Sequence, residues 1–289
     1  MENGWVYWSN WDGVADAANS IQLQRGLSAV NLATPSIGGT MNIITDPASN
    51  ERGGKFKQEG GAGNFLKTTF NYNTGLMLGD KLALSGTLVR KTGDGIIDAT
   101  WTDAWAYYLG SSLQLNEDHR FELYAIGAPQ RHGQNLYKQN IATYSQELAG
   151  DIDGYDVDAF AVGNKFETEA GRTFNQNWGP VSSDYTGKQY WYMYGVGGLF
   201  GGGNQPRYNS NFLNERENFF HKPLVNLNHF MTINEKTRLS SVLYWSGGSG
   251  GGTGTYGSSF RKPAVDGQKW YRSSPWGWDW DAAIATNSD

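Results

Sequence analysis

Apolar and polar side chains alternate with a period of two along much of the chain, the pattern of β-strands that differ between their two faces. Residues 82–90 are the clearest example, because every second residue from Leu82 to Leu88 is leucine or glycine and those between are small or β-branched. The same periodicity predicts further strands over residues 53–63, 65–76, 102–115, 121–125, 219–233 and 239–245. About seven strands are therefore predicted in this part of the chain.

The connections between these predicted strands alternate in length. They are short at residues 78–80, 116–119 and 234–236, and long at residues 92–101, 128–217 and from 247 onward. Only the turn near Gly63 breaks this alternation, because it is short at a position where the alternation predicts a long loop. Alternating short and long connections between antiparallel strands of about ten residues are typical of outer-membrane barrels. In the glycine run from residue 247 we expect a flexible loop, with no strand after it.

The N-terminal residues have a different pattern. Ile21 and Leu23 alternate with glutamines in a short strand that ends at Arg25-Gly26. Pro35 disfavours a continuing helix, the glycines at 38 and 39 allow backbone angles that other residues avoid, and residues 41–44 form a second strand. A short helical turn is expected around residues 14–18. The polar connector at residues 46–51 marks the predicted domain boundary.

Strand, Arg-Gly, small-residue loop, Gly-Gly and strand, in this order over residues 20–45, resemble the C-terminal part of the plug domain of TonB-dependent outer-membrane receptors. Tyr7-Trp8-Ser9-Asn10-Trp11 looks like the version of that plug found in receptors of the Bacteroidetes type. The resemblance implies an all-β fold, a partial antiparallel transmembrane β-barrel preceded by the C-terminal part of a plug. It divides the chain into a plug part at residues 1–51 and an N-terminal barrel part with long extracellular loops at residues 52–289.

The resemblance also implies where the plug residues lie. In the family these segments are inside the barrel, so we expect residues 20–45 to contact the inner face of the strands, with Arg25 near a carboxylate that compensates its desolvation. The alternative is that the motif residues only hold the plug together, which is the better reading for the glycines. The residues of this plug motif are Arg25, Gly26, Gly38, Gly39, Thr40 and Asn42.

The implied function of the intact receptor is active uptake of a scarce nutrient, such as a metal chelate, vitamin or glycan, across the outer membrane. The implied partners are outer-membrane lipids, the nutrient ligand and the TonB complex, which would act through an N-terminal part that this sequence does not show. No enzymatic activity and no cofactor are implied. The N-terminus shows neither a basic segment nor an apolar run, so no signal peptide is predicted. The chain is thus expected to be cytosolic or a piece of a longer protein, and the resemblance favours the second.

Composition supports a chain of strands and polar loops. Among its 289 residues are 39 glycines, aromatic residues make up 14%, and charged residues make up 18%, against about 25% in an average soluble domain. A net charge of −5 with scattered basic residues argues against a nucleic-acid partner. The chain has no cysteine, which excludes disulfides and thiolate chemistry. Aromatic residues near strand ends fit the belts where lipid meets water, namely Trp101, Tyr107, Tyr108, Tyr244 and Trp245.

Three patterns could indicate a catalytic or metal-binding site, but for each of them an interpretation without such a site is favoured. The acidic stretch at residues 151–158 could attract calcium, but its spacing is not that of an EF-hand loop, and a solvated loop is favoured. The glycines at residues 247–254 contain a Gly-x-Ser-x-Gly match without the helix that a nucleophile elbow or a phosphate-binding loop needs. The histidines at 119, 132, 221 and 229 are far apart in sequence. No catalytic or metal site is assigned.

The long connection at residues 128–217 is the predicted site of ligand recognition, because long ordered loops in compact proteins are usually functional. It concentrates flat aromatic surface beside asparagine and glutamine at 175–177 and 189, a mixture suited to a neutral polar ligand such as a glycan or peptide. A lid that packs its aromatic residues on itself is the alternative. So is a different function, a carbohydrate-binding or glycoside-hydrolysing all-β protein with an aromatic-lined cleft. The candidate ligand-binding residues are Trp178, Tyr185, Tyr190, Trp191, Tyr192 and Tyr194.

Overall fold

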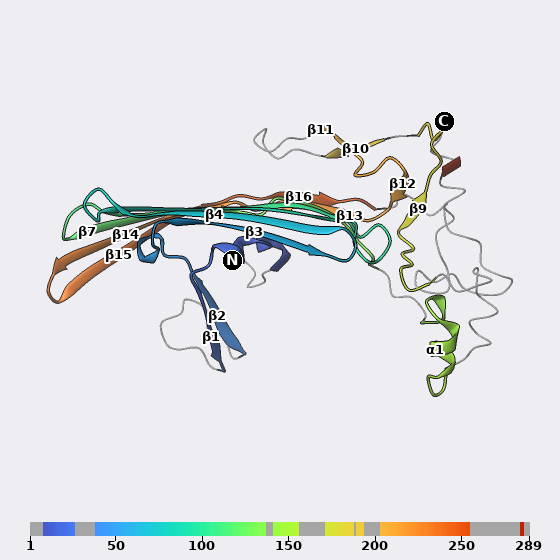
Figure 1. Ribbon diagram of the computed structural model, residues 1–289, viewed down its shortest axis with the longest axis horizontal. Coiled ribbons are helices and arrows are strands. Elements are labelled where there is room, and N and C mark those ends of the chain that lie inside the picture. Colours follow the sequence, from blue (N-terminus) through green and yellow to red (C-terminus); the bar gives the residue numbers. More distant parts are fainter. Residues whose placement is uncertain are drawn as a thin grey trace.

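The computed structural model describes residues 8–26, 38–136, 141–155, 171–187, 189–193, 203–254 and 284–285. The largest element of the fold is one long antiparallel sheet of ten strands (Figure 1). Its main path runs in the order β15-β14-β7-β6-β5-β4-β3, and β8, β13 and β16 extend it at one end. The bounds are β3 (Gly53–Gly61), β4 (Phe65–Met77), β5 (Leu82–Gly93), β6 (Thr102–Gln114), β7 (His119–Gly127), β8 (Gln130–Gly133), β13 (Glu217–His221), β14 (Leu224–Asn234), β15 (Thr237–Ser246) and β16 (Ser249–Gly252).

Three of these strands continue others, so the sheet has seven long strands, as predicted. The breaks between β7 and β8, β13 and β14, and β15 and β16 contain Pro129, Pro223 and Gly247-Gly248. Proline has no N–H for the ladder, so a strand is interrupted where it occurs. Both proline carbonyls still accept a hydrogen bond across the sheet, Pro129 from Trp105 N at 2.9 Å and Pro223 from Gly247 N at 3.1 Å.

The prediction of a flexible glycine loop without a strand was wrong for residues 249–252, which form β16 and pair with β13. Two phenylalanines of β13 explain why glycine forms a strand here. A Cβ added to Gly250 would lie 2.8 Å from Cβ of Phe220, and one added to Gly251 would lie 3.0 Å from Cζ of Phe219. The Phe219 ring thus fills the space that a side chain on Gly251 would occupy, a packing known to support glycine in sheets. At Gly250 the missing side chain lets β16 approach the backbone of β13 closely.

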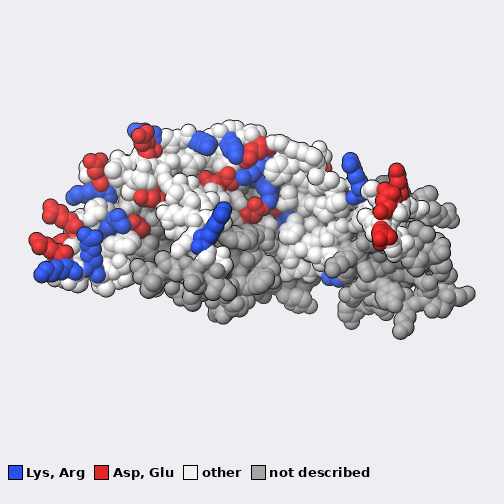
Figure 2. Space-filling model, turned by 90° about the horizontal axis from the view of Figure 1, so that it is seen from below, with Lys and Arg blue, Asp and Glu red and all other residues white. Residues whose placement is uncertain are grey.

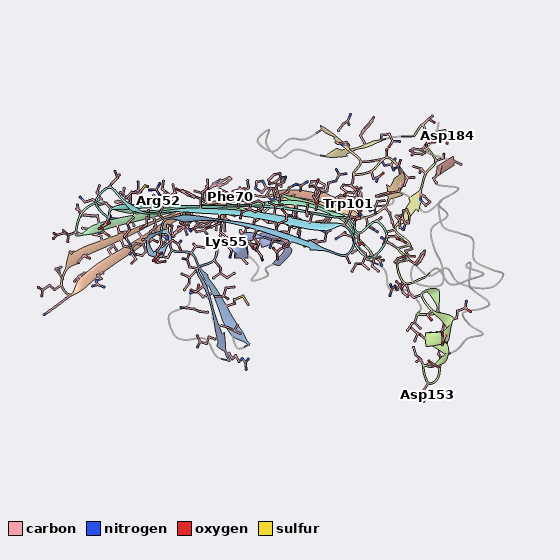
Figure 3. The ribbon with its side chains drawn as sticks, in the orientation of Figure 1. Arg52, Lys55, Phe70, Trp101, Asp153 and Asp184 are labelled. Atoms are coloured by element: carbon pink, nitrogen blue, oxygen red, sulfur yellow. The ribbon has the colours of Figure 1, made fainter. Side chains whose placement is uncertain are left out.

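The two faces of the sheet differ in polarity. In contrast to a sheet of a soluble protein, the apolar side chains are on the exposed face and the polar ones on the covered face. Leu88 and Leu109 are 47% and 61% exposed on one face, whereas Thr87 on the other is 5% exposed. Figure 3 shows Phe70 on the first face and Lys55 on the second. Apolar side chains toward the surroundings and polar ones toward the interior are the pattern of a transmembrane barrel wall. We call these the outer face and the inner face.

Short 3₁₀ helices of the N-terminal part cover the inner face. They are η1 (Trp8–Trp11), η2 (Val14–Ala17) and η3 (Pro47–Ser49), of which η2 and η3 contact β5 and β6. Val14 packs against Val89 and Ala106, and a Cβ on Gly110 would come within 3.0 Å of Pro47 Cγ. The small side chains of the strands, which the alternation predicted, therefore make room for this segment.

Ion pairs also hold the N-terminal part on the inner face. Lys67 Nζ lies 2.7 Å from an Asp16 carboxylate oxygen, and Lys91 is paired with Asp12. Figure 2, which looks at the side of the molecule that carries this segment, shows basic and acidic side chains interspersed. These ion pairs therefore link the N-terminal segment to strands that are about 50 to 80 residues away in the sequence.

The predicted hairpin at residues 20–45 is present, but it does not lie against the strands. β1 (Ser20–Arg25) and β2 (Gly39–Ile44) are antiparallel, with Ile21 opposite Ile43 and Leu23 opposite Met41. The pair projects away from the sheet (Figure 1), and every residue of β1 is exposed. For the described residues 20–26 and 38–45, the expectation of contact with the inner face was therefore wrong except at the base, where the Tyr124 hydroxyl donates to the Thr45 carbonyl at 3.5 Å. The short helices η2 and η3 occupy that face instead.

The glycines of the plug motif have local structural roles in this hairpin. Gly26 and Gly39 have φ of 81° and 132°, values that other residues rarely adopt. A Cβ on Gly39 would also lie 2.6 Å from the Gln24 carbonyl oxygen. Among the described residues Arg25 makes no ion pair with a carboxylate, contrary to expectation.

The expected aromatic belts are present only in part. Trp245 is 53% exposed and lies on the outer face, opposite Val225. Trp101 and Tyr108 are buried, 1% and 3% exposed, so their assignment to a lipid-facing belt was wrong. Tyr108 points to the inner face, because it is next in sequence to Leu109, which points outward. On the inner face its ring stacks on Tyr124 of β7. Within the described ranges, no helix has the length and apolar character needed to span a membrane.

Replacing Gly13 with Ala should loosen the N-terminal segment from the sheet. Gly13 has φ of 90°, and an added Cβ would lie 2.8 Å from Cβ of Ala106. Strain and overpacking together should cost about 2 kcal/mol. Hydrogen exchange of residues 13–18 should become faster. Gly79→Ala is the matched control, because Gly79 has φ of 67° and open space around it. Equal exchange of residues 13–18 in wild type and Gly13→Ala would contradict this seating.

Candidate functional site

Described parts of the long 128–217 connection gather at the end of the sheet where β6 begins (Figure 1). They form η4 (Ile141–Thr143), α1 (Gln146–Gly150) and two small antiparallel pairs. One pair is β9 (Trp178–Pro180) with β12 (Phe212–Asn214), and the other is β10 (Tyr190–Met193) with β11 (Gly203–Pro206). This connection therefore has secondary structure of its own, which the sequence pattern did not reveal.

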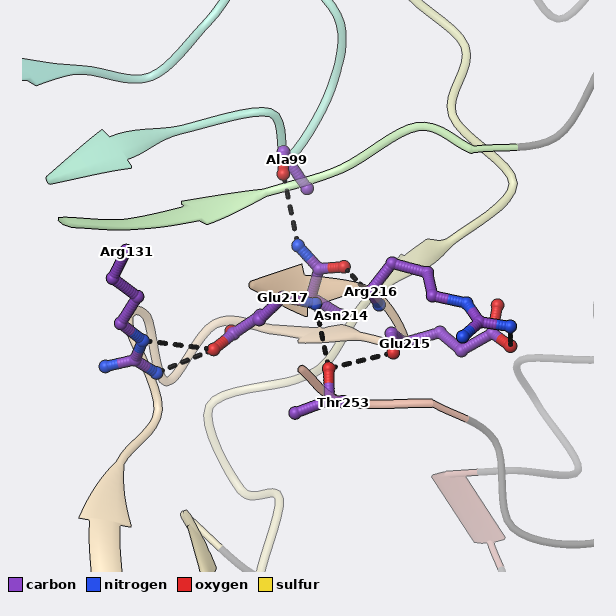
Figure 4. A network of polar contacts seen from close by, with 7 residues as sticks. All are labelled: Ala99, Arg131, Asn214, Glu215, Arg216, Glu217 and Thr253. Atoms are coloured by element: carbon purple, nitrogen blue, oxygen red, sulfur yellow. Dashed lines mark hydrogen bonds and ion pairs between the residues drawn. The ribbon is translucent and has the colours of Figure 1, made fainter. Parts of the chain in front are cut away.

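A network of polar contacts anchors this connection to the end of the sheet (Figure 4). The guanidinium of Arg131 donates to one carboxylate oxygen of Glu217 at 2.6 and 3.2 Å. The Thr253 hydroxyl accepts from the Glu217 N–H at 2.8 Å and donates to the Glu215 carbonyl at 2.9 Å. Asn214 donates to the Ala99 carbonyl at 3.1 Å. Strands β8 and β13 and the segment after β16 are thereby joined at one place.

Asn175 and Asn177, expected beside the ligand, serve this anchor instead. They are 1% and 0% exposed. Asn175 donates to the Asp98 carbonyl at 2.7 Å, and Asn177 donates to a Glu215 carboxylate oxygen at 2.7 Å. A buried amide needs such partners, because leaving it unpaired costs free energy. The sequence alone cannot distinguish an amide that binds a ligand from one that binds the backbone of a loop.

Aromatic and cationic side chains pack around the anchor. Trp101 and Tyr208 stack with ring centroids 3.7 Å apart, and the Arg131 guanidinium lies 5.4 Å from the Trp101 ring centre. Trp178 meets Phe212 of the paired strand edge to face at 5.8 Å. Part of the aromatic surface of the connection is thus packed within it.

Tyr185, another candidate ligand-binding residue, packs with a cationic side chain. The Arg207 guanidinium lies 5.6 Å from the ring centre of Tyr185 and donates to the Gln189 side chain at 2.8 Å. Burial raises the pKa of Tyr185 and lowers that of Arg207. The Ser182 hydroxyl lowers the pKa of Asp184, labelled in Figure 3, by hydrogen bonding to it. These groups form a polar surface outside the sheet.

Of the four candidate aromatic residues between 190 and 194, three lie within the described ranges. Tyr190 is 45% exposed at the start of β10. Trp191 and Tyr192 belong to the same strand, and Tyr194 lies outside the described residues. Tyr190 is therefore a candidate residue whose side chain is both described and open to solvent.

A pocket that the sequence did not indicate lies on the inner face, between η1 and strands β8, β13 and β16. Its volume is about 620 Å³. The residues that line it are Asn10, His132, Gln134, Asn218, Phe219, Phe220, Lys222, Gly248, Ser249, Gly250 and Gly251. On the side of β16, glycines without side chains line the pocket. Amides, an imidazole and an aromatic ring offer hydrogen bonds and stacking to a polar ligand.

No group of three or more metal-binding side chains is present in the described ranges. The acidic stretch is described only at residues 151–155, where Asp151 and Asp153 are exposed. The buried carboxylates Glu215 and Glu217 are engaged by Arg216 at 3.5 Å and by Arg131. The paired carboxylates across a cleft that glycoside hydrolysis needs are not found among these residues.

No family model matches the sequence, and no curated protein matches it. Among solved structures, the open form of the ferric-catecholate import receptor Fiu from E. coli K12 aligns with a TM-score of 0.53 at 12% identity, over 81% of this chain and 29% of Fiu. The closed form has a TM-score of 0.49 at 14% identity, over 78% and 26% of the two chains. The outer-membrane ferripyoverdine receptor of Pseudomonas aeruginosa has 0.44 at 11%, over 82% and 33%.

The fold comparison rests on the open form of Fiu, whose TM-score exceeds 0.5. The fold of this chain is therefore a partial antiparallel transmembrane β-barrel. The polarity of the two faces of the sheet agrees with this fold. This chain spans about three-tenths of the length of Fiu.

Proposed function

We propose that the chain is part of a TonB-dependent receptor that takes up a nutrient across the outer membrane, and that it is not an enzyme. The observation that carries the proposal is the sheet itself, apolar on its outer face and covered on its polar inner face by η2 and η3, the short helices on either side of the hairpin with plug-like sequence. Residues 1–51 would be the C-terminal part of the plug, and residues 52–289 the first part of the barrel. The Trp-rich residues 7–11 support the Bacteroidetes type of this family.

The proposed ligand site lies where the long connections gather, and it continues to the inner-face pocket beside Asn10. On this proposal the nutrient would contact Tyr185 and Tyr190 in the loops and the amides of Gln134 and Asn218 in the pocket. Neutral hydrogen-bonding groups and aromatic rings favour a glycan or peptide. A ferric chelate, as Fiu is named for, is the alternative ligand.

Genetics in the source bacterium tests the proposed function. Deleting the gene that encodes this chain should abolish growth on one limiting nutrient, and a plasmid copy should restore it. The same plasmid should fail to restore uptake when the TonB complex is inactivated, because transport by this class of receptor needs that energy source. Uptake that continues without the TonB complex, or fractionation of the protein outside the outer membrane, would refute the proposal.

Replacing Trp178 with Ala should weaken ligand binding without lowering the amount of folded barrel. Loss of a large aromatic contact at a binding site commonly costs more than 1 kcal/mol, so the Kd should rise about tenfold. Trp191→Ala should act in the same direction. Trp105→Ala is the matched control, because Trp105 is 45% exposed on the outer face, opposite Arg90. Unchanged affinity in both loop variants would show that these residues only pack the connection.

A further inference from the structure

Two histidines that are 110 residues apart in sequence meet on the outer face of the sheet. His119 begins β7, beside the short turn at residues 116–118, and His229 is the middle residue of β14. In the register of these strands His119 is opposite Met231, and Phe121 is opposite His229. The two imidazoles are therefore diagonal neighbours on one face, within reach of each other.

Their nitrogen atoms face each other directly. Nδ1 of His119 lies 2.9 Å from Nε2 of His229, and the ring planes differ by 5° with centroids 5.2 Å apart. Both side chains are half-buried. Phe121 stacks on His229 with centroids 4.4 Å apart and ring planes 7° apart, so an aromatic face packs against that imidazole. One of the two facing nitrogens must carry the proton of this hydrogen bond.

We propose that this histidine pair binds a first-row transition-metal dication. Metal–imidazole bonds are about 2.0–2.1 Å long, so two ligands at a right angle around one ion are about 2.9 Å apart, the separation of the facing nitrogens. Binding requires both lone pairs, so the shared proton moves to the far nitrogen of its own ring through solvent, and no other covalent bond changes. Each ring then turns toward the ion about its soft Cβ–Cγ torsion.

The donor set favours Cu²⁺ over the other divalent ions. Two imidazole nitrogens suit copper, nickel and zinc, and the general order of affinity places Cu²⁺ first. Cis nitrogen ligands at a right angle fit the tetragonal geometry of Cu²⁺. Met231, opposite His119, carries a thioether sulfur near the pair. Since the described residues contain no third histidine or carboxylate at this place, water would complete the coordination.

A bound ion would tie the start of β7 to the middle of β14, beside the short turn at residues 116–118. The strands are already joined there by the Thr232 N–H, which donates to the Asp118 carbonyl at 2.9 Å. The metal would add a second link through side chains. This inference rests on the pair alone and does not depend on the proposed uptake function.

Titration of the full chain in detergent micelles with glycine-buffered Cu²⁺ tests the proposal. Wild type should bind one Cu²⁺ with an electron paramagnetic resonance spectrum of two nitrogen ligands. His119→Gln and His229→Gln should each raise the Kd about tenfold or more and lose one nitrogen from the spectrum, because the chelate is broken. His221→Gln is the matched control, because His221 contacts the hydroxyl of Tyr107 at 3.1 Å instead of another imidazole.

The outcomes separate clearly if circular dichroism shows that all variants keep their strand content. Loss in the two pair variants with retention in the control supports the site. Equal Cu²⁺ affinity in all four proteins, or a wild-type spectrum with a single nitrogen ligand, would overturn it.

Discussion

Replacing Glu217 with Ala should lower the free energy of unfolding by about 3 kcal/mol, because breaking a buried ion pair leaves one charge without its partner. The Glu217 side chain is 6% exposed and that of Arg131 is 20% exposed. The same change removes the side-chain link from β13 to Arg131 of β8, while the Glu217 N–H keeps its contact with the Thr253 hydroxyl. Unfolding by urea in detergent measures the loss.

An exposed ion pair gives the control for this prediction. Lys57 and Glu59 lie 2.8 Å apart with side chains 46% and 34% exposed. Such pairs contribute about 0–1 kcal/mol, so Lys57→Ala should change the free energy of unfolding little. Changing both members of the buried pair, as Arg131→Met with Glu217→Leu, should recover much of the loss, because no charge then remains buried. A Glu217→Ala variant as stable as Lys57→Ala would contradict the anchor.

Replacing Leu109 with Lys should destabilise the folded chain in lipid by about 2–4 kcal/mol, the cost of a lysine at the midplane on the lipid face of a barrel. Leu109 is 61% exposed and lies near the middle of β6 on the outer face. A soluble sheet would respond in the opposite way, because replacing an exposed leucine with lysine removes apolar surface from water. The sign of the effect therefore tells a membrane wall from a soluble surface.

Leu78→Lys is the matched control for the lipid-face substitution. Leu78 is 74% exposed in the turn between β4 and β5, outside the strands. Substitutions at such positions usually change stability by less than about 0.5 kcal/mol. Urea unfolding of both variants in lipid vesicles measures the difference. Equal stability of Leu109→Lys and Leu78→Lys would refute the assignment of the outer face to lipid.

The long strands could be predicted from the sequence because one physical pattern determines them. Alternation from Leu82 to Leu88 specifies two faces whatever surrounds them. Glycine carries no such signal, so β16 was missed: its stability depends on Phe219 and Phe220 of a neighbouring strand. Pro223 interrupts a strand that was predicted as continuous over residues 219–233, and nothing local shows that a strand resumes after Pro129.

The candidate site was less predictable, because its residues meet only in three dimensions. Asn175 and Asn177 were placed beside a ligand, whereas burial and contacts with Asp98 and Glu215 engage them inside the protein. His119 and His229 looked isolated because the strand register, which brings them together, depends on turn lengths. The hairpin at residues 20–45 was correct in its pairing and wrong in its placement, since pairing is local and placement depends on what else occupies the inner face.

Site-directed labelling along β14 tests the central claim, a membrane wall with a lipid side and a polar side. The chain has no cysteine, so each introduced cysteine carries the only label. Positions 225 and 227 have outer-face parity, and positions 226 and 228 have inner-face parity. Spin labels in membranes should be relaxed by oxygen, which partitions into lipid, at 225 and 227, and by a water-soluble nickel complex at 226 and 228. Equal access of the nickel complex to all four positions would contradict the account.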